Sequence, residues 1–121
     1  MTHCSFMIDW EHLAQRQVVE TQRALPEPIR ARAKEVPVFF SRATTDEDDT
    51  CLGLFEGYTL MDGPPAQPDD MPRITLFIDT LAQVANDQKT LFLREVRTTY
   101  LHELGHYFGW DEAQIANVGL A

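Results

Sequence analysis

The feature that most constrains this chain is a run of eleven residues close to its C-terminal end. Residues 102–112 read H-E-L-G-H-Y-F-G-W-D-E, which has the form H-E-x-x-H-x-x-G-x-x-E. On a helix, positions i and i+4 lie on one face about one turn apart, so His102 and His106 can bind the same metal ion. Gly109 tolerates positive φ and can end that helix in a turn. The rest of the chain must therefore form a scaffold around a helix that stops at Gly109.

The chemistry of the run depends on its carboxylates. Glu112 is the first choice for a third ligand, because it stands where three-histidine sites place their last ligand; Asp111 is the alternative, or it caps a following helix. Zinc in a site of two imidazoles and one carboxylate keeps an open position, where it activates a water molecule. Glu103 would take the proton as general base and deliver it to the leaving amine. With His102, His106 and Glu112 as ligands, the run predicts zinc-dependent hydrolysis of peptide bonds.

A long amphipathic helix is expected to carry this run, from about residue 88 to residue 108. A second stripe, with Glu95 and Thr99, runs beside the apolar one and includes the two histidines. Asn86 or Asp87 is the expected N-cap. The helix thus has one face for the core and another for the metal. The apolar stripe comprises Leu93, Val96, Tyr100, Leu104 and Phe108, widened by Phe92 and Leu101.

The remaining elements are expected to be short. The best strand covers residues 73–79, where Ile74, Leu76 and Ile78 alternate with other side chains. Polar or proline-rich loops are expected at 44–50 and 61–72. The other expected elements are helices at 6–24 (capped by Ser5) and 29–35 (Pro28 at its first position), strands at 38–40 and 51–60 (a strand pair or one bent strand), and a helical turn at 81–85.

Length and composition limit the classes of protein to consider. A chain of 121 residues fits one domain, 1–121. Ten basic against nineteen acidic residues give a net charge of −9, which disfavours nucleic acid as a partner. Two cysteines, Cys4 and Cys51, are too few for a disulfide framework and fit a reducing compartment. Because no signal peptide or membrane-spanning stretch is visible, a cytoplasmic protein without membrane contact is expected.

On these residues the chain resembles the zincin metallopeptidases and, more narrowly, the small bacterial minimal zincin family. The likeness covers the helix that ends in Leu25-Pro26, segment 53–57, the strand at 74–79 and the motif itself. It implies zinc as cofactor and an α+β fold, in which a small mixed β-sheet packs on helices and the motif lies on a long C-terminal helix. The family commonly has Asp where this chain has Glu112. Metzincins instead have His there and a methionine turn downstream, whereas the last methionine here is Met71.

Three functions are compatible with the motif. Glu103 favours a zinc peptidase that cleaves a peptide or an extended protein segment, with the strand at 73–79 pairing with the substrate. The second is a metal-binding or interaction module that keeps the zincin scaffold without catalysis. The third is an RNA endonuclease, since residues 109–111 fit the motif H-x-x-x-H-x-x-G-[YW]-D-H of one such family. Glu103 is not expected in that motif, and Glu112 replaces its final histidine.

Overall fold

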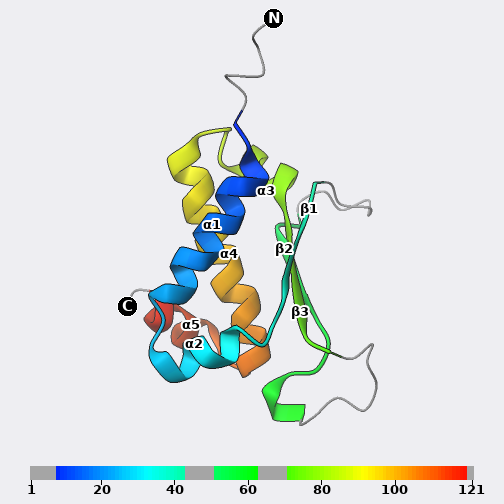
Figure 1. Ribbon diagram of the computed structural model, residues 1–121, viewed down its shortest axis with the longest axis vertical. Helices are drawn as coiled ribbons and strands as arrows, with labels where there is room; N and C mark the ends of the chain where they lie inside the picture. The colour runs from blue at the N-terminus through cyan, green and yellow to red at the C-terminus, as the bar shows by residue number, and fades with distance from the viewer. Residues whose placement is uncertain (1–7, 43–50, 63–70, 120–121) are drawn as a thin grey trace, which may run out of the picture.

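Helices pack on one face of a three-stranded sheet in the computed structural model, which describes residues 8–42, 51–62 and 71–119 (Figure 1). The sheet has the order β1-β3-β2. This is the α+β architecture expected from the sequence. The strands are β1 (Val38–Ser41), β2 (Gly53–Glu56) and β3 (Arg73–Phe77). The helices are α1 (Trp10–Arg23), α2 (Glu27–Ala33), α3 (Ile78–Val84), α4 (Lys89–Phe108) and α5 (Glu112–Gly119), with a 3-10 turn, η2, at Leu60–Asp62.

The sheet is mixed, and β3 is its central strand. It pairs parallel to β1, with Val38 opposite Ile74, and antiparallel to β2, with Gly53 opposite Leu76. Ile74 and Leu76 are fully buried because alternate side chains of a strand point to one face, here toward the helices. The small mixed sheet is therefore confirmed. The prediction that residues 73–79 pair with a substrate is wrong, since β1 and β2 already occupy both edges of β3.

Helix α4 lies between α1 and the sheet and matches the predicted helix to within a residue (Figure 1). The side chains that are completely buried recur every four residues along it, which places them on one face. They are Phe92, Val96, Tyr100 and Leu104. Leu93 and Phe108, which were expected in this stripe, are only partly buried. The core stripe thus begins at Phe92.

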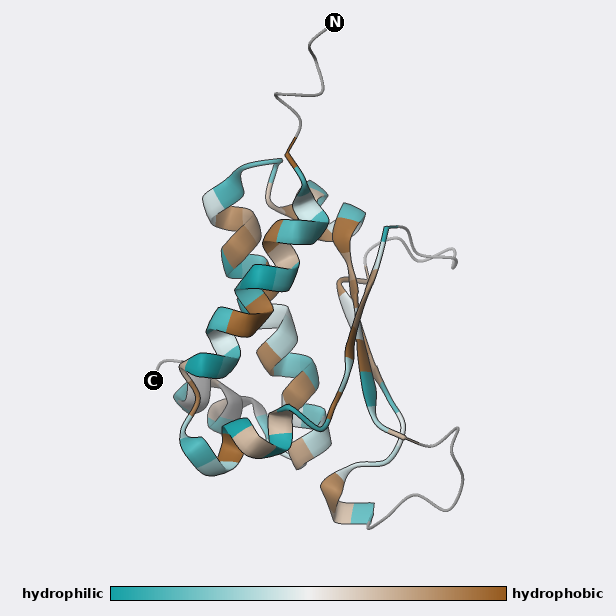
Figure 2. Ribbon diagram, in the orientation of Figure 1, coloured by the Kyte–Doolittle hydropathy of each residue, from teal (hydrophilic) through white to brown (hydrophobic). Residues whose placement is uncertain are grey.

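Helix α1 covers the side of α4 that faces away from the sheet. The Trp10 and Phe92 rings lie 4.6 Å apart, and the Gln22 side-chain amide donates to the Tyr100 hydroxyl at 2.9 Å. Figure 2 shows hydrophobic and hydrophilic stretches alternating along α1, as one buried helix face requires. The expected start at residue 6 is wrong: Asp9 caps α1 by accepting a hydrogen bond from His12 N at 3.1 Å. Ser5 lies outside the described residues.

The connection from the sheet to α4 differs from the prediction. Strand β3 ends at Phe77, opposite the last residue of β1, and α3 begins at once. The expected strand through residue 79 is therefore wrong, whereas the helical turn expected at 81–85 is confirmed as part of α3, which begins three residues earlier. Asn86 and Asp87 adopt positive φ values of 54° and 57° in the turn before α4, and Gln88 is its N-cap. They make this turn rather than cap the helix, since Asn and Asp tolerate the left-handed conformation better than other side chains.

Within residues 51–60 the structure has one short strand, β2, at Gly53–Glu56, so the alternative of a strand pair is wrong. The chain turns at Gly57, where φ is 105°. Helix α2 begins two residues before the expected start. The expected acidic loop at 44–50 and most of the expected proline-rich loop lie outside the described residues, as does Cys4. Among the helices that the structure describes, none is both long and apolar enough to cross a bilayer.

Candidate metal centre

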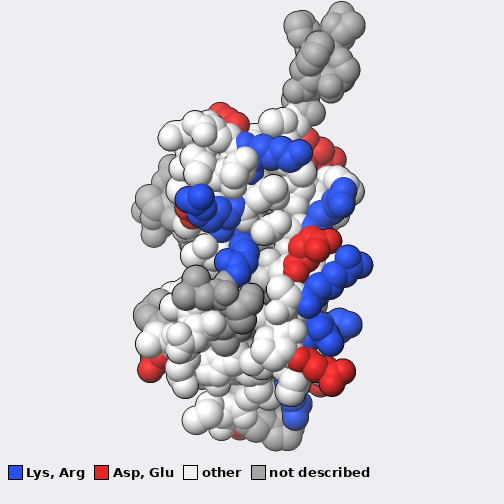
Figure 3. Space-filling view, turned by 90° about the vertical axis from the view of Figure 1, so that its left-hand side faces the viewer, with Lys and Arg blue, Asp and Glu red and all other residues white. Residues whose placement is uncertain are grey.

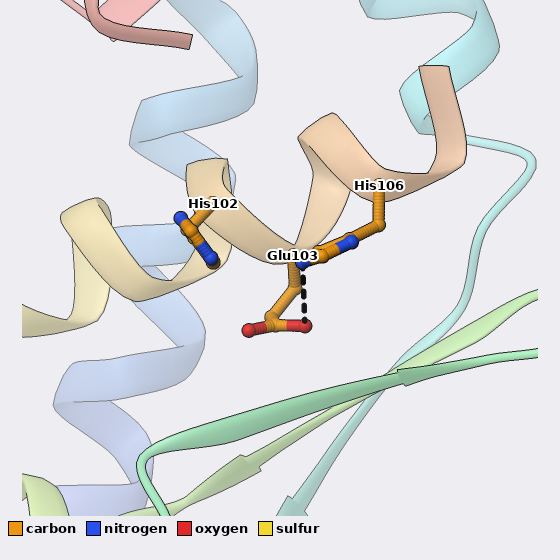
Figure 4. A group of neighbouring side chains, drawn as sticks. All are labelled: His102, Glu103 and His106. Atoms are coloured by element: carbon orange, nitrogen blue, oxygen red, sulfur yellow. Dashed lines mark ion pairs between the residues drawn. The ribbon is translucent and has the colours of Figure 1, made fainter. Parts of the chain in front are cut away.

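The side chains of His102, Glu103 and His106 gather on the face of α4 that is turned toward the strands (Figure 4). One potential ligand atom from each residue lies within 4.8 Å of those of the other two. The two imidazole centroids are 5.1 Å apart, and His106 Nε2 is 4.0 Å from Glu103 Oε1. Helical spacing brings the two histidines together, because positions i and i+4 face the same way, and Glu103 lies beside His106 because it precedes it by three positions.

The arrangement fits a zinc ion. Because each Zn–N bond is about 2.0–2.1 Å long, two imidazole nitrogens on one ion lie within roughly 4 Å of each other. The candidate ligand atoms, which all lie within 4.8 Å of one another, are close to that separation. Two imidazoles with an adjacent carboxylate are also the donors that zinc prefers. His102 and His106 are therefore suited to hold zinc, as predicted.

Glu103 is enclosed, whereas His106 is open to solvent. The exposed fraction of the side chain is 13% for Glu103 and 54% for His106. Gly53 of β2 lies against Glu103: a Cβ at Gly53 would be 3.3 Å from Glu103 Cγ and 2.7 Å from Thr99 Cγ2. Only a glycine lets β2 come so close to α4 without displacement. The strand thereby confines the Glu103 side chain beside the two histidines.

Strand β2 also supplies an aromatic ring to the site. The Phe55 ring lies nearly parallel to that of His106, with an interplanar angle of 13° and centroids 6.4 Å apart. It also contacts the Tyr107 ring at 6.2 Å. Neither Gly53 nor Phe55 was predicted as a site residue from the sequence, because their proximity to α4 depends on how the sheet packs. A glycine inside an apolar strand was the available signal, since it often marks a close backbone approach.

Beyond the histidines, the chain turns as predicted. Gly109 adopts φ 73°, and Trp110 N donates to Gly105 O at 2.9 Å, which closes the helix. Asp111 then caps α5: its carboxylate accepts from Gln114 N at 2.8 Å, while Asp111 N donates to the Gln114 side chain at 2.9 Å. The capping role that was considered for Asp111 is thus observed.

The third ligand stays a prediction. Glu112 is the first residue of α5, directly after the turn that follows the motif helix. Its side chain lies outside the described part of the structure. Within the described part, the group that could hold a metal consists of His102, Glu103 and His106, and Asp111 does not join it.

A groove of about 220 Å³ adjoins the histidines on the side toward the N-terminal end of α4. One wall comes from the start of β2 and the other from the polar stripe of α4. This confirms that Glu95 and Thr99 share a face with His102. The lining residues are Leu52, Gly53, Glu95, Thr98, Thr99, His102 and Glu103.

Comparison with known proteins supports the same interpretation. The sequence model of one family, described as zincin-like metallopeptidase, matches residues 27–120. The match includes all three strands and the complete metal motif. No curated protein matches the chain significantly. The resemblance that was noted from the motif is therefore confirmed.

Proposed function

Because this chain belongs to the zincin-like metallopeptidase family, we propose that it is a zinc-dependent peptidase that cleaves an extended peptide or protein segment. One observation carries the proposal: an enclosed glutamate, Glu103, lies between two histidines whose nitrogens converge with its carboxylate. A site that only stores a metal has no need of a base at this position. Hydrolysis by a water molecule requires one.

Each residue of the motif has a distinct proposed role. His102 and His106 would hold the ion, with Glu112 as the proposed third ligand. Zinc in such a site polarises a carbonyl and lowers the pKa of water from about 15.7 toward about 7. Glu103 would accept the proton of the attacking water and pass it to the leaving amine. The small exposed fraction of Glu103 favours this role, because a carboxylate shielded from solvent interacts more strongly with a nearby charge.

Strand β2 is the best candidate to bind the substrate backbone. It pairs with β3 along one edge, and no described strand pairs with its other edge. It is also the strand that contacts the metal-binding face of α4, through Gly53 and Phe55. An extended peptide added to this edge would run past His102 and Glu103, held by main-chain hydrogen bonds. This assignment replaces the pairing of substrate with β3 that was predicted from the sequence.

The surface charge gives no support to the endonuclease alternative. In Figure 3, the Lys and Arg side chains of the described residues are interspersed with Asp and Glu on the helical side of the molecule. Several pair within their own helix, as Arg23 does with Glu20 at 3.3 Å and Arg30 with Glu27 at 4.0 Å. A nucleic-acid site instead needs a continuous basic track.

Replacement of the proposed base tests the proposal. We expect Glu103→Gln to retain zinc and to cleave a peptide library at least about 100-fold more slowly than the wild type, because general base catalysis contributes about 100- to 10,000-fold. The matched control is Glu20→Gln, which removes one negative charge from α1 and should keep full activity. Cleavage by Glu103→Gln at the wild-type rate would contradict the mechanism. Bound zinc without cleavage by the wild type would favour the non-catalytic module.

A further inference from the structure

The groove beside the metal centre has the dimensions of a pocket for one side chain. Its volume of about 220 Å³ is below the roughly 300–1,000 Å³ of sites for drug-sized ligands. It opens directly from His102 and Glu103, so a residue adjacent to the scissile bond would enter it. We propose that this groove is the specificity pocket of the enzyme and that Glu95 selects a cationic side chain, Lys or Arg. The inference rests on the proposed peptidase function.

Glu95 is too distant to be part of the metal centre. It precedes His102 by seven residues, which places it about 10 Å away along the helix axis. Within the described residues, the metal-binding group contains His102, Glu103 and His106 but not Glu95. Glu95 therefore lines the part of the groove that is away from His102 and lies outside the group that could hold a metal.

The charge of Glu95 is not balanced by its own helix. Carboxylates on helices usually pair with residues three or four positions away, and these positions hold no cation. They are Leu91, Phe92, Thr98 and Thr99. In the part of the chain that the structure describes, no ion pair or hydrogen bond involves the Glu95 side chain, although it is half-buried. A partly desolvated carboxylate of this kind gains from an incoming cation.

The walls of the groove suit a long aliphatic stem. Leu52 and Thr99 line it together with Glu95, and Thr99 lies one helical turn from Glu95 in the direction of His102. Lys and Arg side chains lay their methylene stems along apolar surfaces and keep the charged end near a polar group. A side chain that started beside Glu103 would follow these walls and bring its cation toward Glu95. An acidic side chain would be repelled there by both carboxylates.

Cleavage of matched peptides tests this proposal. The peptides differ at single positions flanking the cleaved bond, with lysine, norleucine or glutamate, and the zinc-loaded enzyme is used. We expect kcat/KM for the lysine peptide to exceed that for the norleucine peptide by about 10-fold or more, as a hydrogen bond between charged groups would give. Glu95→Gln should reduce this ratio to near unity, and Glu95→Lys should shift the preference to the glutamate peptide. Glu20→Gln should leave the ratio unchanged.

A binding measurement separates this inference from the proposed function. Fluorescence anisotropy gives the affinity of the lysine and norleucine peptides for Glu103→Gln protein, which should bind them without turnover. We expect about 10-fold or more tighter binding of the lysine peptide, and loss of that difference when Glu95→Gln is added. Equal affinities, or a lysine preference that survives Glu95→Gln, would overturn the inference whether or not the wild type cleaves peptides. Absence of cleavage with an intact lysine preference would overturn only the peptidase.

Discussion

Two faces of α4 have opposite characters. The core face consists of side chains that are completely buried: Phe92, Val96, Tyr100 and Leu104. The groove face carries polar side chains, most of them in contact with solvent: Glu95, Thr99, His102, Glu103 and His106. Both faces belong to one continuous helix of twenty residues. A single element thus supplies much of the core and all described members of the candidate metal centre.

The difference shows that stability and chemistry are separated across the helix. Residues of the core face are held by apolar burial, at about 25 cal/mol per Å² removed from water. Residues of the groove face contribute through what they can bind and not through burial, so their substitution should change the free energy of unfolding little. Gly53 of β2 packs against the groove face of α4, at Thr99 and Glu103. Substitutions on each side should therefore affect different measurements.

The largest effect is expected on the core face. Leu104 is completely buried, so Leu104→Ala should lower the free energy of unfolding by about 2–5 kcal/mol, through lost burial and the cavity left behind. Urea denaturation measures this change. Val84→Ala is the control, because Val84 is 51% exposed and should cost about 0.5 kcal/mol or less. Equal losses in both variants would contradict the complete burial of Leu104 in the core face.

The second prediction concerns Glu112, the proposed third zinc ligand, which lies beyond the end of α4. Glu112→Gln should weaken zinc binding by more than about 100-fold, because changes in groups around the ligands alone cost about 10- to 100-fold. Asp111→Asn is the matched control and should keep wild-type affinity, since Asn also caps helices well. Competition with a zinc chelator measures both affinities. Loss of zinc from Asp111→Asn but not from Glu112→Gln would exchange their assigned roles.

A third prediction concerns the close contact between Gly53 of β2 and the groove face of α4. Gly53→Ala should cost about 1–3 kcal/mol and slow cleavage, because the added Cβ would meet Thr99 Cγ2 at 2.7 Å and push β2 away from Glu103. Thr99→Ser removes that Cγ2 atom. The double variant should therefore recover most of the stability, which a double-mutant cycle by thermal or urea denaturation would show. A Gly53→Ala protein as stable as the wild type would refute the close packing.

The smallest effect involves the one polar group within the core face. Burial raises the pKa of Tyr100 above its usual 10.0, and the hydrogen bond from Gln22 partly opposes this. The stability from this group is present below the unfolded pKa and is lost as pH rises through the raised pKa, since the unfolded chain ionises first. Tyr100→Phe should cost about 1 kcal/mol near neutral pH. Its stability should also decline less above pH 10 than that of the wild type.

Urea titrations near neutral pH and above pH 10 give both quantities for Tyr100→Phe. Tyr107, whose pKa is also raised by burial, is present in both proteins, so the difference isolates Tyr100. Identical alkaline curves for the two proteins would contradict the effect of burial on Tyr100.

Local signals in the sequence predicted α4 and its end well. Helical periodicity and the left-handed preference of Gly109 depend only on neighbouring residues, and both were confirmed. Which strands pair with a given strand, in contrast, does not depend on neighbouring residues alone. The alternation of Ile74 and Leu76 identified a strand, but its central place depends on pairing with segments distant in sequence. The prediction that Asn86 or Asp87 is the N-cap of α4 was wrong because these residue types favour both helix caps and left-handed turns.

The same division applies to the site. His102, Glu103 and His106 lie within two turns of one helix, so their spacing alone predicted their convergence. The opposite wall, with Leu52, Gly53 and Phe55, comes from a strand that only tertiary packing brings to α4. Glu95 was placed on the correct stripe of α4. Its position inside a groove became visible only with β2 opposite it.

The zinc content of the purified protein tests the central claim most directly. If the groove face of α4 is a metal centre, the wild type and Glu103→Gln should each bind about one zinc ion per chain. His102→Asn and His106→Asn should bind almost none, while their circular dichroism shows folded protein, because neither residue belongs to the core face. Full zinc occupancy in both histidine variants, or a wild type that binds no zinc, would contradict the account.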